Sequence, residues 1–181
     1  TTPGRTLFLY ATLGPASRTV TPEAARFNLR FDPARLDAAS EAFGLALPSR
    51  IGQGSEEGAR RALCLGPDEW ELSAAGTDGG TIAAAFAGLY AELPHSLVEI
   101  SDREVAITLD GPQAATLLSV GCPVDVESFA VGTGARTVLD GVQVVLYRDA
   151  PDRFTLEVWR SFLPHVLGLL EIGNRELATG L

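Results

Sequence analysis

The sequence of 181 residues contains no lysine and no methionine, and it has only two histidines and two cysteines. Without lysine the chain cannot form a Schiff base with pyridoxal phosphate or a carbonyl substrate, and it lacks the lysine of Walker-type and kinase-type ATP sites. His95, His165, Cys64 and Cys122 lie far apart along the chain. They therefore cannot supply the closely spaced ligands of a structural zinc or iron–sulfur site.

Acidic residues outnumber basic residues in the chain. All 14 basic residues are arginines, against 23 acidic residues, and the formal net charge is −9. This charge repels phosphate, and the arginines form no stripe, so we expect neither nucleic acid nor an anionic membrane as a partner. No apolar run reaches the roughly 18 residues of a membrane helix. Because 46% of the residues are hydrophobic and only 20% are charged, below the usual share of about 25%, the composition favours a large subunit contact.

The cellular compartment can be predicted from the cysteines and the N-terminal segment. Two widely separated cysteines in a chain of this composition are typical of reduced thiols in a cytosolic protein. Residues 7–16 are apolar but short, are interrupted by Gly14 and Pro15, and are followed by no cleavage signal, so we expect no signal peptide. Because the sequence begins at Thr1, we expect the native start to be missing. The sequence predicts a cytoplasmic protein.

An approximate internal repeat organises the chain. Residues 27–31 alternate apolar and polar side chains and are followed by Pro33 and a helical pattern, and residues 105–109 are followed in the same way by Pro112. Proline suits the first helical turn because its missing N–H would have no partner there. The two helical patterns end near Gly44 and Gly121, and we expect each glycine to adopt the left-handed conformation that ends a helix.

The second part of each half repeats as well. Two short strands flank a turn at residues 66–68, and two more flank a turn at residues 151–152, so each half is predicted to contain a β-hairpin. A helical pattern follows each hairpin, with one apolar face formed by Ile82, Phe86, Leu89 and Leu93 in the first half and by Phe162, Val166, Leu169 and Leu170 in the second.

The sequence therefore predicts an α+β fold of two pseudo-repeated strand-helix-hairpin-helix halves. We expect residues 1–26 to be an N-terminal extension with a first strand, residues 27–94 the first half and residues 95–181 the second half of one compact unit. Residues 95–100 and 105–109 are predicted to form a further hairpin around residues 101–104. Residues 52–58 and 131–134 are predicted to be loops.

Several residue types that could support nucleophilic catalysis were weighed against structural roles. Ser161 and His165 lie four residues apart, on one face of a helix, but no G-x-S-x-G elbow is present, so we expect Ser161 to cap the last helix and His165 to flank it. Cys122 is expected to be a packed thiol, because a helix C-terminus disfavours a thiolate. Cys64 alternates within a strand and is expected to be buried.

The remaining polar groups also favour structural interpretations. Glu99, Asp102 and Glu104, with Arg103 between them, are expected to form a solvated turn rather than a catalytic pair. The glycine-containing segments 78–81 and 132–134 do not complete a phosphate-binding motif and are expected to be ordinary turns. A last group could form an anion patch, interfacial ion pairs or a solvated surface: Arg136, Arg148, Arg153 and Arg160. We predict no catalytic, cofactor-binding or metal-binding residues.

Short motifs taken in order give a specific resemblance. They are Leu65-Gly-Pro-Asp-Glu-Trp70, Val98-Glu-Ile-Ser-Asp-Arg103, Leu109-Asp-Gly-Pro112, Gly121-Cys-Pro-Val-Asp125, Phe129-Ala-Val-Gly132, Ala135-Arg-Thr137 and Arg160-Ser-Phe162. With these motifs, the chain resembles the gamma subunit of heterotetrameric sarcosine oxidase from about residue 19 to residue 170. Leu163-Pro164-His165 departs from the aromatic or charged run that often follows the last motif, which leaves open the alternative of a relative acting on another N-methyl amine.

The resemblance implies a non-catalytic small subunit of an oxidoreductase complex that oxidatively demethylates sarcosine to glycine. The products are hydrogen peroxide and, with tetrahydrofolate, methylenetetrahydrofolate. It further implies that the alpha and beta subunits carry FAD, FMN, NAD and the folate site, and that the delta subunit binds zinc. The gamma fold is similar to the folate-binding domain of the glycine-cleavage aminomethyltransferase.

Two alternatives to the subunit interpretation remain open from the sequence. One is a folate-binding or one-carbon transfer module of the aminomethyltransferase type, for which only Trp70 and Asp102 are nominal candidates to stack on and grip a pterin ring. The other is a free-standing homo-oligomer. The sequence does not tell which residues form a subunit interface.

Overall fold

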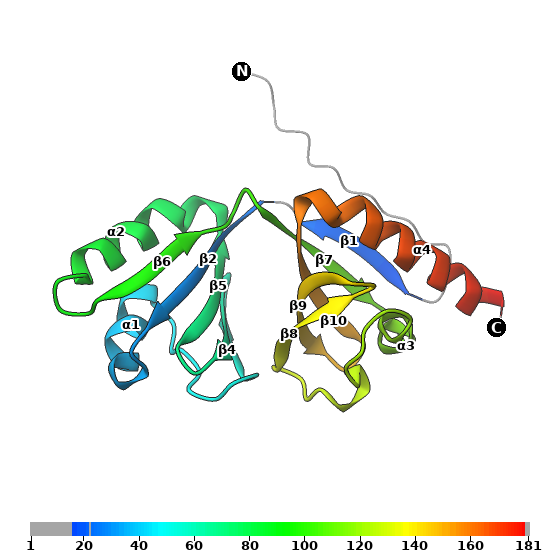
Figure 1. Ribbon diagram of the computed structural model, residues 1–181, viewed down its shortest axis with the longest axis horizontal. Coiled ribbons are helices and arrows are strands. Elements are labelled where there is room, and N and C mark those ends of the chain that lie inside the picture. Colours follow the sequence, from blue (N-terminus) through cyan, green and yellow to red (C-terminus); the bar gives the residue numbers. More distant parts are fainter. Residues whose placement is uncertain (1–15, 22, 180–181) are drawn as a thin grey trace, which may run out of the picture.

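The computed structural model describes residues 16–21 and 23–179, which form two β-sheets facing each other with helices on their outer sides (Figure 1). In the described residues the first sheet has five strands, in spatial order β3 (Gly54–Glu57), β4 (Arg60–Gly66), β5 (Glu69–Ala75), β2 (Ala24–Phe31) and β6 (His95–Glu99). The second sheet, also of five described strands, has the order β8 (Gly134–Leu139), β9 (Val142–Ala150), β10 (Arg153–Trp159), β7 (Glu104–Asp110) and β1 (Ser17–Thr21).

Helices cover the outer face of each sheet. The first sheet carries α1 (Leu36–Phe43) and α2 (Gly79–Leu89), and the second carries α3 (Ala114–Ser119) and α4 (Leu163–Thr179) (Figure 1). Short 3₁₀ turns precede helices or connect elements: η1 (Pro33–Arg35), η2 (Gly76–Asp78), η3 (Val126–Ser128) and η4 (Arg160–Phe162). The α+β class and the repeated strand-helix-hairpin-helix pattern are confirmed. Within the described ranges, no helix is both long and apolar enough to span a membrane.

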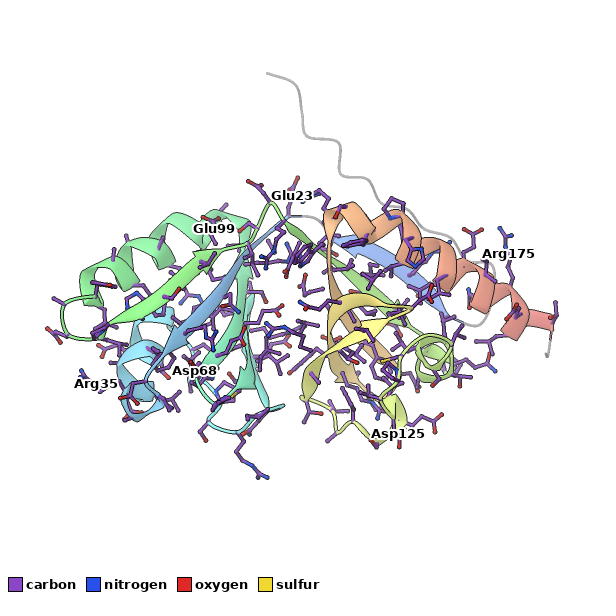
Figure 2. The ribbon with its side chains drawn as sticks, in the orientation of Figure 1. Glu23, Arg35, Asp68, Glu99, Asp125 and Arg175 are labelled. Carbon is purple, nitrogen blue, oxygen red and sulfur yellow. The ribbon has the colours of Figure 1, made fainter. Side chains whose placement is uncertain are left out.

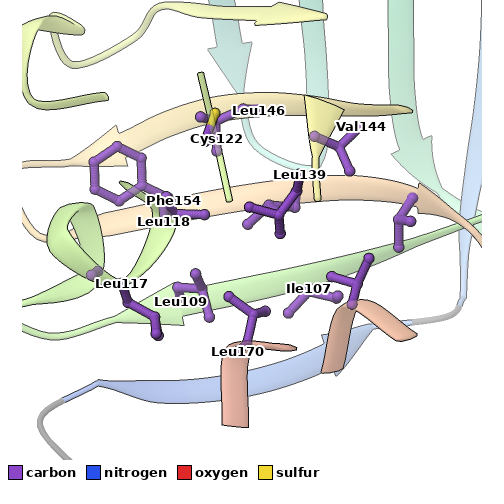
Figure 3. Packing of buried hydrophobic residues seen from close by; sticks show 14 of the residues in the cluster. Ile107, Leu109, Leu117, Leu118, Cys122, Leu139, Val144, Leu146, Phe154 and Leu170 are labelled. Atoms are coloured by element: carbon purple, nitrogen blue, oxygen red, sulfur yellow. The ribbon is translucent and has the colours of Figure 1, made fainter. Parts of the chain in front are cut away.

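Each half has its own apolar core between sheet and helices. In the first half, Phe27 and Leu29 of β2 pack with Phe86 of α2. In the second half, Ile107 and Leu109 of β7 pack with residues of α3, α4 and β10, as Figure 3 shows. Alternation puts every second side chain of a strand on the same face, which is why these strands can bury apolar residues on one side only. The halves thus meet through their other sheet faces.

The predicted hairpin of residues 95–100 and 105–109 is wrong. β6 pairs antiparallel with β2 in the first sheet, whereas β7 pairs with β1 and β10 in the second. Ile100 accepts backbone bonds from Arg103 and Glu104, so the turn is tight, but it carries the chain from one sheet to the other. Local alternation identified both strands and could not identify their partners, because strand pairing depends on contacts far away in the sequence.

The sheet memberships also bear on the predicted division of the chain. β1, from the segment 1–26, lies in the second sheet, and β6, from the segment 95–181, lies in the first. The division into segments 1–26, 27–94 and 95–181 as structural units stays a prediction. The predicted loop of residues 52–58 is corrected, because β3 pairs there with β4 at the edge of the first sheet. The segment 131–134 forms a turn that leads into β8.

The two predicted glycine caps have different outcomes. Gly44 ends α1 with a φ of 73°, as expected. Gly121 does not adopt positive φ; α3 ends at Val120 in the right-handed conformation. Gly121 is needed for another reason, because a Cβ there would lie 3.0 Å from the backbone nitrogen of Asp140 and 3.1 Å from Leu169. The expected cap by Ser161 is also wrong: Ser161 lies inside η4, which has no side-chain cap.

Candidate functional site

The inner faces of the two sheets carry charged side chains instead of apolar ones. Arg26 of β2 and Glu71 of β5 point into this layer from the first half, and Glu104 of β7 and Glu157 of β10 from the second. Arg26, Glu71 and Glu104 have relative exposures of 1%, 9% and 7%. Figure 2 shows side chains filling the space between the two sheets. We call the charged side chains on these inner faces the charged layer.

The pseudo-repeat explains which charges meet. When Asp32 is aligned with Asp110, Arg26 corresponds to Glu104. The strand registers then make Glu71 correspond to Glu157, because Trp70 is opposite Leu29 and Leu156 is opposite Ile107. Glu71 and Glu157 are therefore alike in the two halves, whereas Arg26 and Glu104 differ. Because of this difference, Arg26 of the first half can pair with Glu157 of the second.

Ion pairs join the halves through this layer. Arg26 Nε donates to Glu157 Oε2 at 2.7 Å, with the Arg26 side chain only 1% exposed. Arg61 of β4 pairs with Asp149 of β9 at 2.5 Å and lies over the ring of Tyr147. In a third pair the arginine comes from the second half: Arg136 of β8 forms a bidentate ion pair with Glu69 of β5, at 3.1 and 2.7 Å. Bidentate and buried pairs of this kind fix an orientation more than isolated surface pairs do.

Glu71 is the unbalanced member of the charged layer. Burial, together with the charges of Glu157 and Glu104, raises its pKa well above the ordinary value. Burial also raises the pKa of Glu157, against the opposing effect of its pair with Arg26. Within the described residues, Glu71 has no side-chain hydrogen bond, whereas Glu104 accepts one from Arg103 at 2.8 Å. The layer therefore contains more carboxylate charge than its arginines neutralise.

A buried acid with a raised pKa is a common mark of catalytic sites, so the space around Glu71 decides its interpretation. The cavity bordered by Glu71, Glu157, Tyr147 and Thr155 measures about 20 Å³. That is room for about one water molecule and not for an organic substrate. In the part of the chain that the structure describes, no group of three or more His, Cys, Asp or Glu residues could hold a metal ion. A cleft of about 260 Å³ borders Arg26 and Glu157 but not Glu71. Glu71 therefore has no room beside it for an organic substrate, and the ion pairs of the charged layer join the halves.

The predicted solvated turn is wrong for one of its three acids. Glu99 and Asp102 are exposed, but Glu104 is buried in the charged layer. Glu99 accepts a hydrogen bond from Ser101 Oγ at 2.9 Å, and the Asp102 carbonyl accepts one from Arg160 Nε at 3.1 Å. Glu104 is buried because β7 faces the opposite sheet at that position, which local polarity does not reveal.

The nucleophile candidates adopt the structural roles expected for them apart from the cap. His165 Nε2 lies 3.0 Å from Asp140 Oδ2 on the surface, and no contact between His165 and Ser161 is seen in the described residues. Both cysteines are buried and free. Burial raises the pKa of the Cys64 thiol, which donates to the carbonyl of Gly66 at 3.2 Å, so this thiol is a poor nucleophile.

The four C-terminal arginines do not gather into an anion patch. Arg136 makes the interfacial pair described above. Arg148 donates to the backbone carbonyls of Glu127, Phe129 and Pro151. Arg153 pairs with Asp110, and Arg160 donates to Asp102. Of the glycine segments, residues 78–81 lie where η2 passes into α2, and Asp78 pairs there with Arg60 at 3.6 Å.

The nominal folate candidates do not fit a pterin site. Trp70 is 1% exposed and stacks on Phe31 with ring centroids 4.4 Å apart. Its indole Nε1 donates to the Pro48 carbonyl at 2.8 Å. Asp102 is exposed in the turn between the sheets. Because the Trp70 ring belongs to the first apolar core, it offers no free face for stacking.

A second contact between the halves was not predicted from the sequence. Gly54 donates its N–H to the carbonyl of Gly132 at 2.8 Å, and Gly134 donates to that of Gly52 at 2.8 Å. Gly52 and Gly132 have φ values of 83° and 82°, so the two segments are near copies related by the pseudo-repeat. We call this reciprocal contact the glycine junction. The repeat of Ile51-Gly-Gln-Gly54 and Val131-Gly-Thr-Gly134 is the sequence signal that could have revealed it.

The glycine junction forms one wall of a surface cleft. The cleft has a volume of about 410 Å³ and is lined by Arg50, Ile51, Gly52, Gln53, Phe129, Thr133, Gly134 and Ala135. We call it the junction cleft. Its chemistry is mainly apolar, with Arg50 as its charged lining residue. A larger cleft, of about 500 Å³, is lined by polar and charged residues that include Arg61, Asp110, Asp149 and Arg153.

Comparison with known proteins decides the family. Residues 29–172 match the model of the sarcosine oxidase, gamma subunit family. The chain belongs to this family. The sarcosine oxidase gamma subunit of Corynebacterium sp. (strain P-1) is 30% identical over 146 residues, which cover 78% of this chain and 70% of that protein. The gamma subunit of Corynebacterium sp. (strain U-96) is 27% identical over 133 residues, covering 72% of this chain and 64% of that protein.

Solved structures agree with the membership in the gamma subunit family. A chain of heterotetrameric sarcosine oxidase from Corynebacterium sp. U-96, in complex with pyrrole 2-carboxylate, matches with a TM-score of 0.79 and 25% identity, covering 92% of this chain and 88% of that one. The glycine cleavage system aminomethyltransferase T of Bartonella henselae matches with a TM-score of 0.69 and 18% identity, over 88% of this chain and 46% of that one. The second match supports the predicted fold relationship alone.

Proposed function

We propose that this chain is the gamma subunit of a heterotetrameric sarcosine oxidase, in which it stabilises the large catalytic subunits. The observation that carries the proposal is the agreement of family and fold over most of the chain: a family match over residues 29–172 and a TM-score of 0.79 to a chain of such a complex. The reaction of the complex is the oxidative demethylation of sarcosine to glycine.

The chemistry in this proposal belongs to the partner subunits. FAD, FMN, NAD and tetrahydrofolate are held by the alpha and beta subunits, and zinc by the delta subunit. This chain contributes no catalytic, cofactor-binding or metal-binding residue. In support, the cavity beside the buried Glu71 measures only about 20 Å³. The proposed compartment of the complex is the cytoplasm.

Co-expression with the alpha, beta and delta subunits of a sarcosine oxidase from the same organism tests the proposal. We expect a tagged chain to co-purify with subunits that carry flavin absorbance, and the eluted complex to produce hydrogen peroxide when sarcosine is added. The chain purified alone is expected to show neither flavin absorbance nor sarcosine-dependent peroxide. Recovery of the chain without any flavin-containing partner would contradict the proposal.

A second measurement separates the subunit from a one-carbon transfer module. Isothermal titration of the chain alone with tetrahydrofolate is expected to give no heat of binding, because Trp70 is buried against Phe31. Micromolar binding by the isolated chain would favour the module. Turnover by the isolated chain, with flavoprotein contamination excluded by absorbance, would show that it has catalytic groups of its own.

A further inference from the structure

The junction cleft combines an exposed apolar surface with a single type of charge. Ile51 lines the cleft and is 64% exposed. Val131 occupies the equivalent place on the other side of the glycine junction and is 53% exposed, but it does not line the cleft. Phe129 adds an aromatic wall, and no Asp or Glu is among the lining residues. In a chain with a net charge of −9, an acid-free apolar cleft is an unusual surface.

Arg50 gives the cleft its chemical preference. Among the arginines that the structure describes, the others each have a hydrogen bond or an ion pair, while the guanidinium of Arg50 makes neither. A guanidinium presents a planar fork of donors that matches a carboxylate bidentately. The cleft therefore offers a free carboxylate-binding fork beside apolar walls.

The backbone of the glycine junction makes the cleft rigid. A Cβ on Gly134 would lie 2.4 Å from the carbonyl oxygen of Leu146, and one on Gly54 would lie 2.4 Å from the Tyr147 ring. The two glycine segments therefore pack directly against β9, and the reciprocal hydrogen bonds of Gly54 and Gly134 hold them to each other. A preformed cleft lowers the entropic cost of binding a partner, since little of its wall must become ordered.

We propose that the junction cleft is a docking site for a partner subunit, which inserts a bulky apolar side chain and places a neighbouring carboxylate on Arg50. This inference rests on the proposed function and goes beyond it by naming the surface and the chemistry of the inserted segment. In protein interfaces a few residues in well-packed pockets carry most of the binding free energy, and aromatic residues and arginine are enriched among them. The charge complementarity to Arg50 favours an acidic segment over a basic or neutral one.

The test measures binding of the purified full chain to the complex of the remaining subunits, expressed without gamma from the same genome. The cleft variant Arg50→Ala/Ile51→Ser is compared with a control variant, Arg175→Ala/Ile172→Ser, on α4. The control is matched because Ile51 and Ile172 are 64% and 58% exposed, and because Arg175 is an exposed arginine whose partner, Glu171, lies on the same helix. We expect the cleft variant to bind at least tenfold more weakly and the control within twofold of the native chain.

Each outcome assigns a failure to one of the two proposals. If the native chain binds and both variants bind equally well, the cleft is not the docking site while the proposed function stands. If the native chain itself does not bind the remaining subunits, the proposed function fails and the docking site with it. Arg50→Lys gives a graded check: it keeps the charge and loses the fork, so we expect an intermediate affinity.

Two further measurements keep the result independent of folding and of small ligands. Thermal unfolding of the isolated variants should match the native chain, and hydrogen exchange of the native chain at residues 48–54 and 129–135 should slow when the complex forms. Unchanged exchange there would overturn the docking site even if a variant were unstable. The competing occupant of the cleft is tetrahydrofolate, which is titrated into the free chain. If it binds the native chain and not Arg50→Ala, the cleft is a small-molecule site and not a docking site.

Discussion

The core within each half is apolar, whereas the layer between the two halves is charged. Between sheet and helices, Phe27, Leu29 and Phe86 form a core of apolar side chains. Between the two sheets, Arg26 and Glu157 meet as a buried ion pair. Apolar burial stabilises a fold in proportion to area, whereas a buried ion pair offsets much of its attraction by the cost of removing both charges from water. The cores therefore supply stability, and the charged layer sets how the halves are oriented.

The largest expected effect lies in the apolar core. Phe86→Ala removes a ring that is fully buried between α2 and the first sheet. We expect the free energy of unfolding to fall by about 4 kcal/mol, from lost burial and the cavity that remains. Chemical denaturation monitored by tryptophan fluorescence measures it. A loss below about 1 kcal/mol would mean that the outer cores do not dominate stability.

A slightly smaller loss is expected when one partner of the buried ion pair is removed. Arg26→Ala leaves Glu157 buried without its 2.7 Å partner, beside Glu71 and Glu104. We expect a loss of about 3 kcal/mol, as is found when a buried pair is broken on one side. The measurement is the same denaturation experiment.

The double variant Arg26→Met/Glu157→Leu separates charge from packing. It removes both charges and keeps side chains of similar volume, so we expect stability close to that of the native chain. A double variant as unstable as Arg26→Ala would show that the aliphatic part of Arg26, and not its charge, stabilises the contact between the halves.

The glycine junction is expected to be next in sensitivity. Gly134→Ala places a Cβ 2.4 Å from the backbone oxygen of Leu146, which cannot move without disturbing β9. We expect a loss of about 2 kcal/mol in the free energy of unfolding. Gly80→Ala in α2 is the control, because no atom lies within 4 Å of its added Cβ. This change is expected to be neutral or to stabilise by about 0.5 kcal/mol. Equal effects of the two substitutions would contradict the close contact.

The smallest expected effect has the opposite sign. Because burial and the neighbouring Glu157 and Glu104 raise the pKa of Glu71, the folded protein retains a proton that the unfolded chain releases. The stabilisation from this retained proton is complete below the pKa of Glu71 in the unfolded chain. It is lost as the pH rises through the pKa of Glu71 in the folded protein. Glu71→Gln avoids the loss, so we expect it to stabilise the protein by about 1 kcal/mol at alkaline pH and to be nearly neutral at acid pH.

A control for the pH dependence lies on the same strand. The hydrogen bond from Arg136 lowers the pKa of Glu69, so its contribution is present above the unfolded pKa and is lost as the pH falls through the folded pKa. Glu69→Gln is therefore expected to destabilise the protein at neutral pH and to have less effect in acid. Unfolding midpoints measured from pH 4 to pH 9 compare the two variants. The same sign for both at pH 8 would contradict the assignment.

Much of the fold could be predicted because local patterns repeat in the two halves. The alternation of residues 27–31 and 105–109, the prolines that follow, and the two hairpins all correspond to described elements. The pairing of β6 with β2 could not be predicted, because His95–Glu99 alternates equally well for either sheet. β3 was missed because Gly54–Glu57 is a polar edge strand with no apolar face.

The residues of the candidate sites could not be predicted from their neighbours in the sequence. Glu104 follows a polar turn in the sequence and is nevertheless buried, since its neighbours come from the opposite sheet. Arg50 stood out in no motif, because what distinguishes it is the lack of a partner in the described structure. Such properties depend on contacts between distant residues, which composition and spacing do not contain.

The exchange of β1 into the second sheet has a consequence during synthesis on the ribosome. β1 (Ser17–Thr21) is made early, but its partner β7 (Glu104–Asp110) emerges only after the whole first sheet has been translated. At about 5–20 residues per second, this strand waits several seconds with its hydrogen-bonding groups exposed. The first sheet can close as soon as β6 appears, whereas the second must pair with a strand that was made before the first sheet. The two halves, similar in shape, are thus expected to mature at different times.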